Sequence, residues 1–195
     1  MRSMRMLAAA ACSLGVLAAS QLPGVASAST QAAAQGGTAP SGVHQQVRAA
    51  RAATDKYHEL SVAKKAGYTK LVDVNGIACI AMPGMGAMGV HYLNPKRLNG
   101  TIRLRQPEAL VYRFANNGHL RLAALEYLVL RSDWEKAHGK NAPRPRLFGH
   151  TFNRTLAGNR FGLPEYYSLH AWVWRHNPMG RFTMWNPRVY CPPGI

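Results

Sequence analysis

Glu126 is the residue whose position points most directly to chemistry. It lies in the segment 120–130, which is predicted to form a β-strand because it is apolar and bounded by turn residues. Strict alternation would place five apolar residues on its face: Leu120, Leu122, Ala124, Leu128 and Leu130. A carboxylate buried among such side chains is strongly unfavourable unless a cation, a metal ion or hydrogen-bond donors compensate it. Glu126 therefore requires a partner.

His91 and His170 are the histidines best placed to complete a site with Glu126. His91 follows a glycine-rich loop in one predicted strand, His170 lies in another, and both side chains can point inward. Two imidazoles and one carboxylate are the ligand set of catalytic zinc sites and of non-haem iron sites with open coordination positions. The three residues predict a site for one divalent transition-metal ion, zinc, iron or manganese. The sequence leaves open whether the protein is an enzyme.

The strand that carries His170 is predicted to continue through Trp174. Alternation would then place Trp172, Trp174 and His176 on the face of His170. The two tryptophans would exclude water from the metal, and the three residues together form a candidate ligand-binding face. His176 is also the alternative ligand if His170 points elsewhere, and Glu108 is the alternative carboxylate.

A structural polar network is the competing interpretation of Glu126. Carboxylates are often buried against arginine in such networks, and a lone inward histidine is more often a core residue than a ligand. The candidate partners in this interpretation are Arg103, Arg105, Arg113 and Arg175, or the hydroxyl groups of Tyr92 and Tyr112. Both interpretations remain open at the level of sequence.

The loop before His91 suggests two further sites, each with weaker support. Met82, Met85, Met88 and His91 recur every three residues, and thioethers favour Cu(I), but Pro83 and the surrounding glycines oppose the helix that would bring them together. Copper is therefore the less favoured metal. Residues 84–89 also match G-x-G-x-x-G, yet no helix follows, so a dinucleotide site is not expected.

The N-terminus has the pattern of a secretory signal peptide. Arg2 and Arg5 precede an apolar stretch, and Ala26-Ser27-Ala28 provides the small residues of a cleavage site. We expect 1–28 to be removed, 29–41 to form a flexible leader, and the mature chain to be secreted or periplasmic. No later apolar run is long enough for a transmembrane helix.

Cleavage would remove Cys12 and leave Cys79 and Cys191. Exported proteins usually meet an oxidising environment, so a disulfide between these two residues is expected. The alternative is a nucleophilic or metal-binding thiol.

The chain is strongly basic, with 24 Lys and Arg against eight Asp and Glu and a net charge of +16. Loss of Arg2 and Arg5 would lower this charge by two, to +14. Outside the cytoplasm such a charge favours anionic envelope polymers or glycans. The basic residues are scattered and no nucleic-acid-binding motif accompanies them, so specific nucleic-acid recognition is not expected.

The remaining pattern predicts a single α+β domain over 42–195. Apolar residues recur at helical spacing over 43–66, and Gly67 is placed to end a long helix. Short strands separated by turn residues follow, at 77–81, 88–93, 109–114, 120–130 and 166–174, with a short helix at 134–137. We expect an antiparallel sheet curled into a partial barrel or sandwich, with the N-terminal helix across it.

Several blocks of the chain resemble a known group of proteins. The blocks are Gly86-Ala87-Met88-Gly89-Val90-His91-Tyr92 with Asn94, Pro107-Glu108-Ala109-Leu110-Val111-Tyr112, Glu126-Tyr127, Leu147-Phe148-Gly149, the run from Leu169 to Trp174, Asn177-Pro178, Trp185-Asn186-Pro187 and Cys191. In these blocks the chain resembles a group of small secreted bacterial proteins to which no activity is assigned. The resemblance implies a shared secreted fold and no particular reaction.

Three classes of function follow from these patterns. The first is a secreted metal-binding protein with a site at His91, Glu126 and His170. The second is a basic, tryptophan-rich module that binds envelope glycans or polyanions, and the third is a structural envelope protein without a small-molecule site. No serine nucleophile elbow or phosphate-binding loop indicates a common hydrolase.

Overall fold

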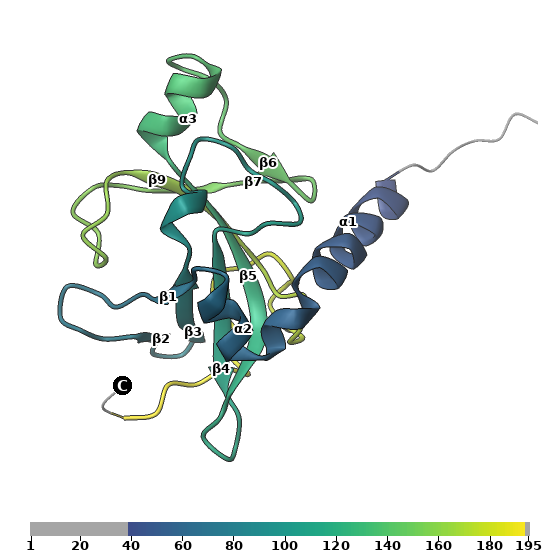
Figure 1. Ribbon diagram of the computed structural model, residues 1–195, viewed down its shortest axis with the longest axis vertical. Coiled ribbons are helices and arrows are strands. Elements are labelled where there is room, and N and C mark those ends of the chain that lie inside the picture. Colours follow the sequence, from purple (N-terminus) through teal and green to yellow (C-terminus); the bar gives the residue numbers. More distant parts are fainter. Residues whose placement is uncertain (1–38, 194–195) are drawn as a thin grey trace, which may run out of the picture. The chain divides into compact units, whose positions relative to one another are not determined.

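An antiparallel sheet of seven strands is the centre of the fold (Figure 1). The computed structural model describes residues 39–193. The strands run in the order β1-β3-β4-β5-β9-β8, and β2 also pairs with β3. Their bounds are β1 Thr69–Lys70, β2 Cys79–Met82, β3 Gly86–Leu93, β4 Ala109–Phe114, β5 Leu120–Leu130, β8 Asn153–Thr155 and β9 Tyr166–Ala171.

Short helices and one small hairpin complete the described chain. The hairpin pairs β6, Arg146–Leu147, with β7, His150–Thr151. The helices are α1 Ala39–Thr54, η1 Asp55–His58, α2 Leu60–Lys65, η2 Pro95–Arg97 and α3 Arg131–His138. Among the helices within 39–193, none combines the length and the apolar composition needed to cross a membrane.

The predicted N-terminal segments lie largely beyond the described residues. The predicted signal peptide, 1–28, is outside them, as are residues 29–38 of the predicted leader. The last three residues of that leader belong to α1 instead.

The mixed helix and sheet architecture with antiparallel strands is confirmed, and the sheet is not closed into a barrel. In the part of the chain that the structure describes, the edge strand β8 does not pair with β1 or β2 at the opposite edge, so the sheet stays open.

The single helix predicted over 43–66 is wrong, because three shorter helical segments replace it. At the end of α1, the hydroxyl group of Thr54 donates a hydrogen bond of 2.8 Å to the carbonyl of Ala50. The carbonyl of Tyr57 accepts a hydrogen bond of 2.6 Å from Tyr112 in the sheet, and Glu59 is extended, with φ −84° and ψ 105°. The sheet therefore holds this turn, and the chain leaves the helical conformation here although its apolar residues recur at helical spacing.

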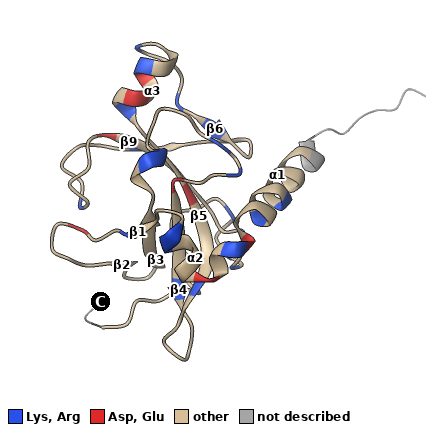
Figure 2. Cartoon of the chain, viewed as in Figure 1, with Lys and Arg blue, Asp and Glu red and all other residues tan. Residues whose placement is uncertain are grey.

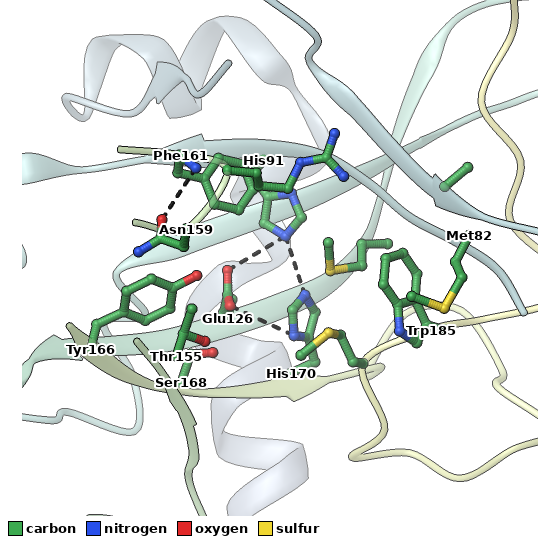
Figure 3. Close-up of a pocket in the computed structure, with 14 residues that line it drawn as sticks. Met82, His91, Glu126, Thr155, Asn159, Phe161, Tyr166, Ser168, His170 and Trp185 are labelled. Carbon is green, nitrogen blue, oxygen red and sulfur yellow. Dashed lines mark hydrogen bonds and ion pairs between the residues drawn. The ribbon is translucent and has the colours of Figure 1, made fainter. Parts of the chain in front are cut away.

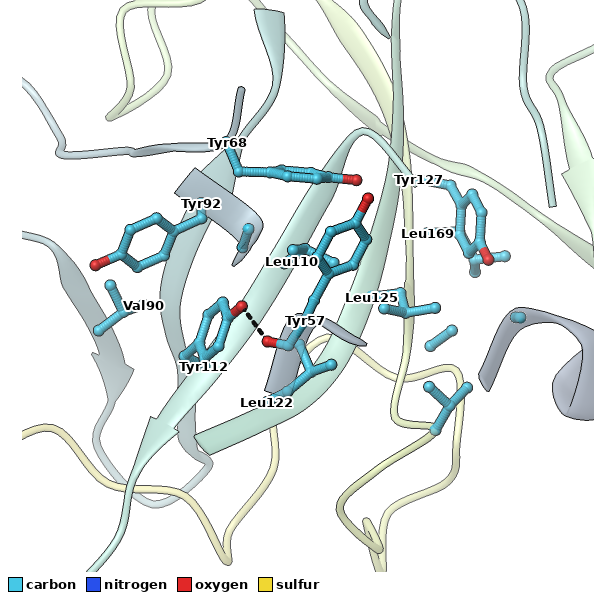
Figure 4. Packing of buried hydrophobic residues seen from close by; sticks show 14 of the residues in the cluster. Tyr57, Tyr68, Val90, Tyr92, Leu110, Tyr112, Leu122, Leu125, Tyr127 and Leu169 are labelled. Atoms are coloured by element: carbon cyan, nitrogen blue, oxygen red, sulfur yellow. Dashed lines mark hydrogen bonds between the residues drawn. The ribbon is translucent and has the colours of Figure 1, made fainter. Parts of the chain in front are cut away.

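The two faces of the sheet differ in chemistry. One face, which we call the aromatic face, carries a buried cluster that Figure 4 shows. Its members include Val90, Tyr92, Leu110, Tyr112, Leu125, Tyr127 and Leu169 from the sheet, with Val47, Ala50, Tyr57 and Ala63 from the helical segments. The hydroxyl groups of Tyr68, Tyr112 and Tyr127 donate to backbone carbonyls at 2.6–2.7 Å, so these buried polar groups are satisfied.

The opposite face, which we call the site face, carries small residues and all three predicted metal ligands. Ala87, Val111, Ala123, Ala124, Trp172 and Val189 form a separate buried cluster there. Small side chains on the middle strands leave space above the sheet, and longer side chains from β3, β5 and β9 extend into that space.

A β-bulge in β5 places two leucines on the face opposite to the predicted one. Val111 pairs with Ala124 and Tyr112 pairs with Leu122, so Ala123 is an extra residue. Leu122 therefore turns to the aromatic face, as does Leu120, and neither lies beside Glu126. The prediction of strict alternation along 120–130 is therefore wrong at Ala123.

The disulfide between Cys79 and Cys191 is formed and joins β2 to the C-terminal segment, across a separation of 112 residues. Beside it, Ala87 and Asn186 exchange backbone hydrogen bonds of 3.2 and 3.1 Å. Gly86 has φ +86°, and a Cβ atom there would lie 2.2 Å from the carbonyl oxygen of Asn186. Only glycine allows this close approach, which holds the C-terminal segment over the site face.

Candidate metal centre

Three strands bring His91, Glu126 and His170 together on the site face. Glu126 of β5 and His170 of β9 are direct partners in the strand pairing. His91 of β3 lies across β4, where Ala109 pairs with Glu126 and Val111 pairs with His91. The methyl group of Ala109 is short enough for the imidazole and the carboxylate to meet above it.

The donor atoms of these residues converge, as Figure 3 shows. His91 Nε2 lies 3.4 Å from Glu126 Oε2 and 3.2 Å from His170 Nε2. His170 Nδ1 lies 3.6 Å from Glu126 Oε1, and one donor atom from each residue falls within 4.8 Å of the others. In a tetrahedral site with metal–ligand bonds of about 2.0–2.1 Å, ligand atoms lie about 3.3 Å apart. The two distances from His91 Nε2 are close to this value, so the group could hold a metal ion.

Burial controls the protonation of all three groups. His91, Glu126 and His170 are 2%, 7% and 2% exposed. Burial lowers the pKa of both histidines to about 4, so both are neutral near pH 7, the form that binds metals. Burial also raises the pKa of Glu126, while the proximity of His91 and the hydroxyl group of Ser168 oppose this rise.

The competing partners predicted for Glu126 do not reach it. Within residues 39–193, the ion pairs of Glu126 are with His91 and His170 and involve no arginine. Tyr92 and Tyr112 belong to the cluster on the aromatic face. The structural alternative is therefore reduced to a network of one carboxylate and two neutral imidazoles, which contains no fixed positive charge.

A mostly apolar cavity of about 310 Å³ opens on these donor atoms. Burial raises the pKa of Tyr166 in its wall to about 12, so this phenol remains neutral. The other lining residues are Ala81 and Met82 of β2, Met88 of β3, Thr155 of β8, Asn159, Arg160 and Phe161 of the following loop, Ser168 of β9, and Met184 and Trp185 of the C-terminal segment.

Polar contacts fix the loop between β8 and β9 over the cavity. Arg160 forms an ion pair of 2.7 Å with Asp73, and its carbonyl accepts from Val74. The guanidinium group lowers the pKa of Asp73, which stays charged. Asn159 bonds to both ends of its own turn, at Leu156 and Leu163. Phe161 is thereby held with its ring centroid 6.3 Å from that of His91.

The continuous strand predicted through Trp174 is wrong, so Trp172, Trp174 and His176 do not share the face of His170. β9 ends at Ala171, because the next backbone N–H, that of Trp172, donates to Arg181 rather than to a neighbouring strand. Trp172 stays beside His170, with ring centroids 6.4 Å apart, and its indole N–H donates to Thr183. Trp172 therefore packs beside His170 and does not line the cavity at the metal centre.

Trp174 and His176 lie away from the three donor residues. Trp174 packs with the cluster on the aromatic face, and its ring contacts His58. His176 is exposed, with Nδ1 3.2 Å from a guanidinium nitrogen of Arg188. His176 is thus no substitute ligand.

The alternative carboxylate, Glu108, belongs to a different environment. Its Oε2 accepts the backbone N–H of Leu128 at 3.0 Å, and it is not part of the metal-ligand group. Burial raises its pKa to about 8, so Glu108 is mostly protonated at neutral pH. It is a second buried acid, separate from the site.

The glycine and methionine loop has a structural role that explains its composition. The G-x-G-x-x-G match leads into strand β3 and not into a helix, so the dinucleotide interpretation is wrong. Gly89 has φ +100°, and a Cβ atom there would lie 2.4 Å from the carbonyl oxygen of Tyr112. Met82 and Met88 line the cavity while Met85 does not, so the regular spacing brings two of its three methionines to the cavity of His91.

Sequence reasoning missed most of the cavity wall. Tyr166 and Ser168 precede His170 by four and two residues on the same strand, so alternation could have identified them. Phe161 and Trp185 come from irregular segments, where no periodicity indicates direction. Their place depends on the ion pair of Asp73 and on the C-terminal segment held at Gly86.

Comparisons with protein-family models, with curated proteins and with solved structures find no match for this chain.

Proposed function

We propose that His91, Glu126 and His170 bind one divalent transition-metal ion in an exported protein. The observation that carries this proposal is the convergence of three buried donor atoms within 4.8 Å, one from each of three strands. The disulfide between Cys79 and Cys191 supports the export, because such bonds persist in oxidising compartments.

A bound cation accounts for the buried carboxylate better than hydrogen bonds alone. The ion-pair partners of Glu126 in the described chain are imidazoles that burial keeps neutral near pH 7, so they supply little positive charge. A divalent ion would neutralise the carboxylate and use the free nitrogen lone pair of each ring. The same ion would take the place of the hydrogen bond of 3.2 Å between the two Nε2 atoms.

The donor set favours zinc, iron or manganese. Two imidazole nitrogens and a carboxylate oxygen suit these divalent ions, whereas Cu(I) prefers thiolates and thioethers. The three protein ligands would leave coordination positions open toward the cavity of about 310 Å³. This is the arrangement of metal sites that act on a bound water or substrate, and it is the basis for proposing a metal-dependent activity.

The metal content of the purified protein tests this proposal. We expect close to one equivalent of zinc, iron or manganese in untagged protein purified from its export compartment, measured by inductively coupled plasma mass spectrometry. The variants His91→Ala and His170→Ala should lose the ion, and the matched control His119→Ala should retain it, because His119 is exposed. Protein that stays far below one equivalent after each ion is offered would overturn the proposal.

A further inference from the structure

A second cavity, of about 500 Å³, combines positive charge with unpaired donors. It lies between α1 and the loop that follows β9, and its lining residues differ entirely from those of the metal centre. We call it the arginine cavity. Its cationic lining residues are Arg51 of α1 and Arg175 and Arg181 of the loop, with His44 and His176 at its exposed wall, and no acidic residue lines it.

The arginines of this cavity have no counter-ion among residues 39–193. The ion pairs in that part of the chain involve Arg131, Arg154 and Arg160 and none of the three cavity arginines. The positive charge of Arg175 also acts on Arg113. Burial first, and then this charge, lower the pKa of Arg113. Figure 2 shows α1 with residues coloured blue for arginine, and the helix contains no Asp or Glu.

Two buried N–H groups at this cavity lack an acceptor. The indole Nε1 of Trp174 and the guanidinium Nε of Arg175 are both inaccessible to solvent and form no hydrogen bond within the described residues. Buried donors are nearly always paired, and an unpaired one costs about 1–3 kcal/mol. Both donors belong to residues that line the cavity.

The cavity wall is fixed rather than loose. Arg51 lies over the ring of Trp174, with its Cζ atom 4.5 Å from the ring centroid. Asn177 is buried, its amide donates to Thr183 and Trp185, and its oxygen accepts from Met179. These contacts hold the Trp174 ring and the turn around Asn177 in place before any ligand arrives, which lowers the entropic cost of ordering this wall.

We propose that the arginine cavity binds an acidic saccharide through its carboxylate or phosphate group. Arginine is the side chain best suited to such oxyanions, because its planar group donates two parallel hydrogen bonds. A cavity of about 500 Å³ is larger than a bare anion needs and leaves room for the attached sugar unit. The net charge of +16 would attract acidic polymers toward the cavity.

Calorimetric titration with defined saccharides tests this site. The probes are tetragalacturonate for the carboxylate, glucose 6-phosphate for the phosphate, and neutral maltotetraose. We expect at least one acidic probe to bind at least about tenfold more tightly than the neutral one, as charge-assisted hydrogen bonds of about 1.5–3 kcal/mol imply. The acidic probe that binds identifies the source of the oxyanion.

Variants assign the binding to the cavity. Arg175→Gln and the exposed Arg181→Gln should each weaken binding about tenfold. Arg105→Gln removes the same charge at an exposed position outside the cavity and should leave the affinity within about twofold. Arg181→Gln also decides the matter if Arg175→Gln fails to fold. Glu126→Gln should retain saccharide binding, which separates this site from the proposed metal centre.

Three results would overturn the proposal. They are equal binding of acidic and neutral saccharides, an unchanged affinity in Arg181→Gln, and an equal loss in Arg105→Gln. A short DNA duplex that competes equally in wild type and Arg181→Gln would show instead that the whole basic surface attracts polyanions.

Discussion

At the scale of single residues, the two buried acids Glu108 and Glu126 have different partners. Glu108 is protonated near neutral pH and accepts a backbone N–H, so it needs no cation. Glu126 faces two imidazoles that burial keeps neutral near pH 7, so they supply little positive charge. The residues that carry the proposed chemistry were identifiable from sequence, because a carboxylate in an apolar strand is rare and two histidines lay in other strands.

The stability of Glu126→Gln without metal distinguishes a ligand from a structural carboxylate. In metal-free protein this change replaces a buried acid, whose pKa burial raises and which no fixed cation compensates, by a neutral group of the same shape, so we expect the free energy of unfolding to stay the same or to rise. With metal at about 100 times its dissociation constant, wild type should gain about 2.7 kcal/mol and the variant much less. Urea unfolding measures both. A loss of several kcal/mol in the metal-free variant would indicate a structural network.

Glu108 makes stability depend on pH in a defined direction. Its pKa is raised from its ordinary value of 4.5 to about 8 by burial, so the folded protein binds more protons than the unfolded chain between these values. Its contribution is fully present below pH 4.5 and is lost as the pH rises through 8. We expect the decline of unfolding free energy between these limits to be smaller in Glu108→Gln, by on the order of a few kcal/mol. Equal slopes in variant and wild type would refute this assignment.

At the scale of elements, strands with regular alternation were predictable and their irregularities were not. β4 and β5 have the predicted bounds, because each is an apolar run between turn residues. The bulge at Ala123 and the end of β9 at Ala171 depend on partners distant in sequence: the carbonyl of Ala123 accepts from the backbone of Trp174 and Arg175. No local pattern encodes such contacts, which explains why the strand predicted to continue through Trp174 ends earlier.

Gly89 links the shape of β3 to the site. Gly89→Ala should destabilise the protein and weaken metal binding, because its Cβ atom would meet Tyr112 at 2.4 Å, two residues before His91. Gly118→Ala is the matched control, since Gly118 also has positive φ, +78°, but has no atom within 4 Å of the added Cβ. Thermal unfolding and metal titration of both variants check this. If both change metal affinity equally, backbone strain alone is responsible and the contact is not.

At the scale of the whole molecule, the C-terminal segment closes one wall of the metal cavity. Met184 and Trp185 line that cavity, and the disulfide between Cys79 and Cys191 holds the segment to β2. Export, the removal of 1–28 and the resemblance to small secreted bacterial proteins remain predictions from sequence. The disulfide and the basic composition agree with them.

Removal of the disulfide should therefore affect both stability and the site. For a closed loop of about a hundred residues, chain entropy gives a loss on the order of 4–5 kcal/mol in a Cys79→Ser, Cys191→Ser double variant. Wild type in reductant should behave like the variant, and the variant should not respond to reductant. Denaturant unfolding measures the loss. Unchanged stability would show that the bond contributes nothing to the fold.

The most direct test of the central claim is a crystal structure of the mature chain with bound metal, measured at the absorption edge of that metal. We predict a single strong anomalous peak about 2.0–2.2 Å from a nitrogen of His91, an oxygen of Glu126 and a nitrogen of His170. A peak at exposed histidines alone, or no peak between these three residues in metal-soaked crystals, would contradict the account.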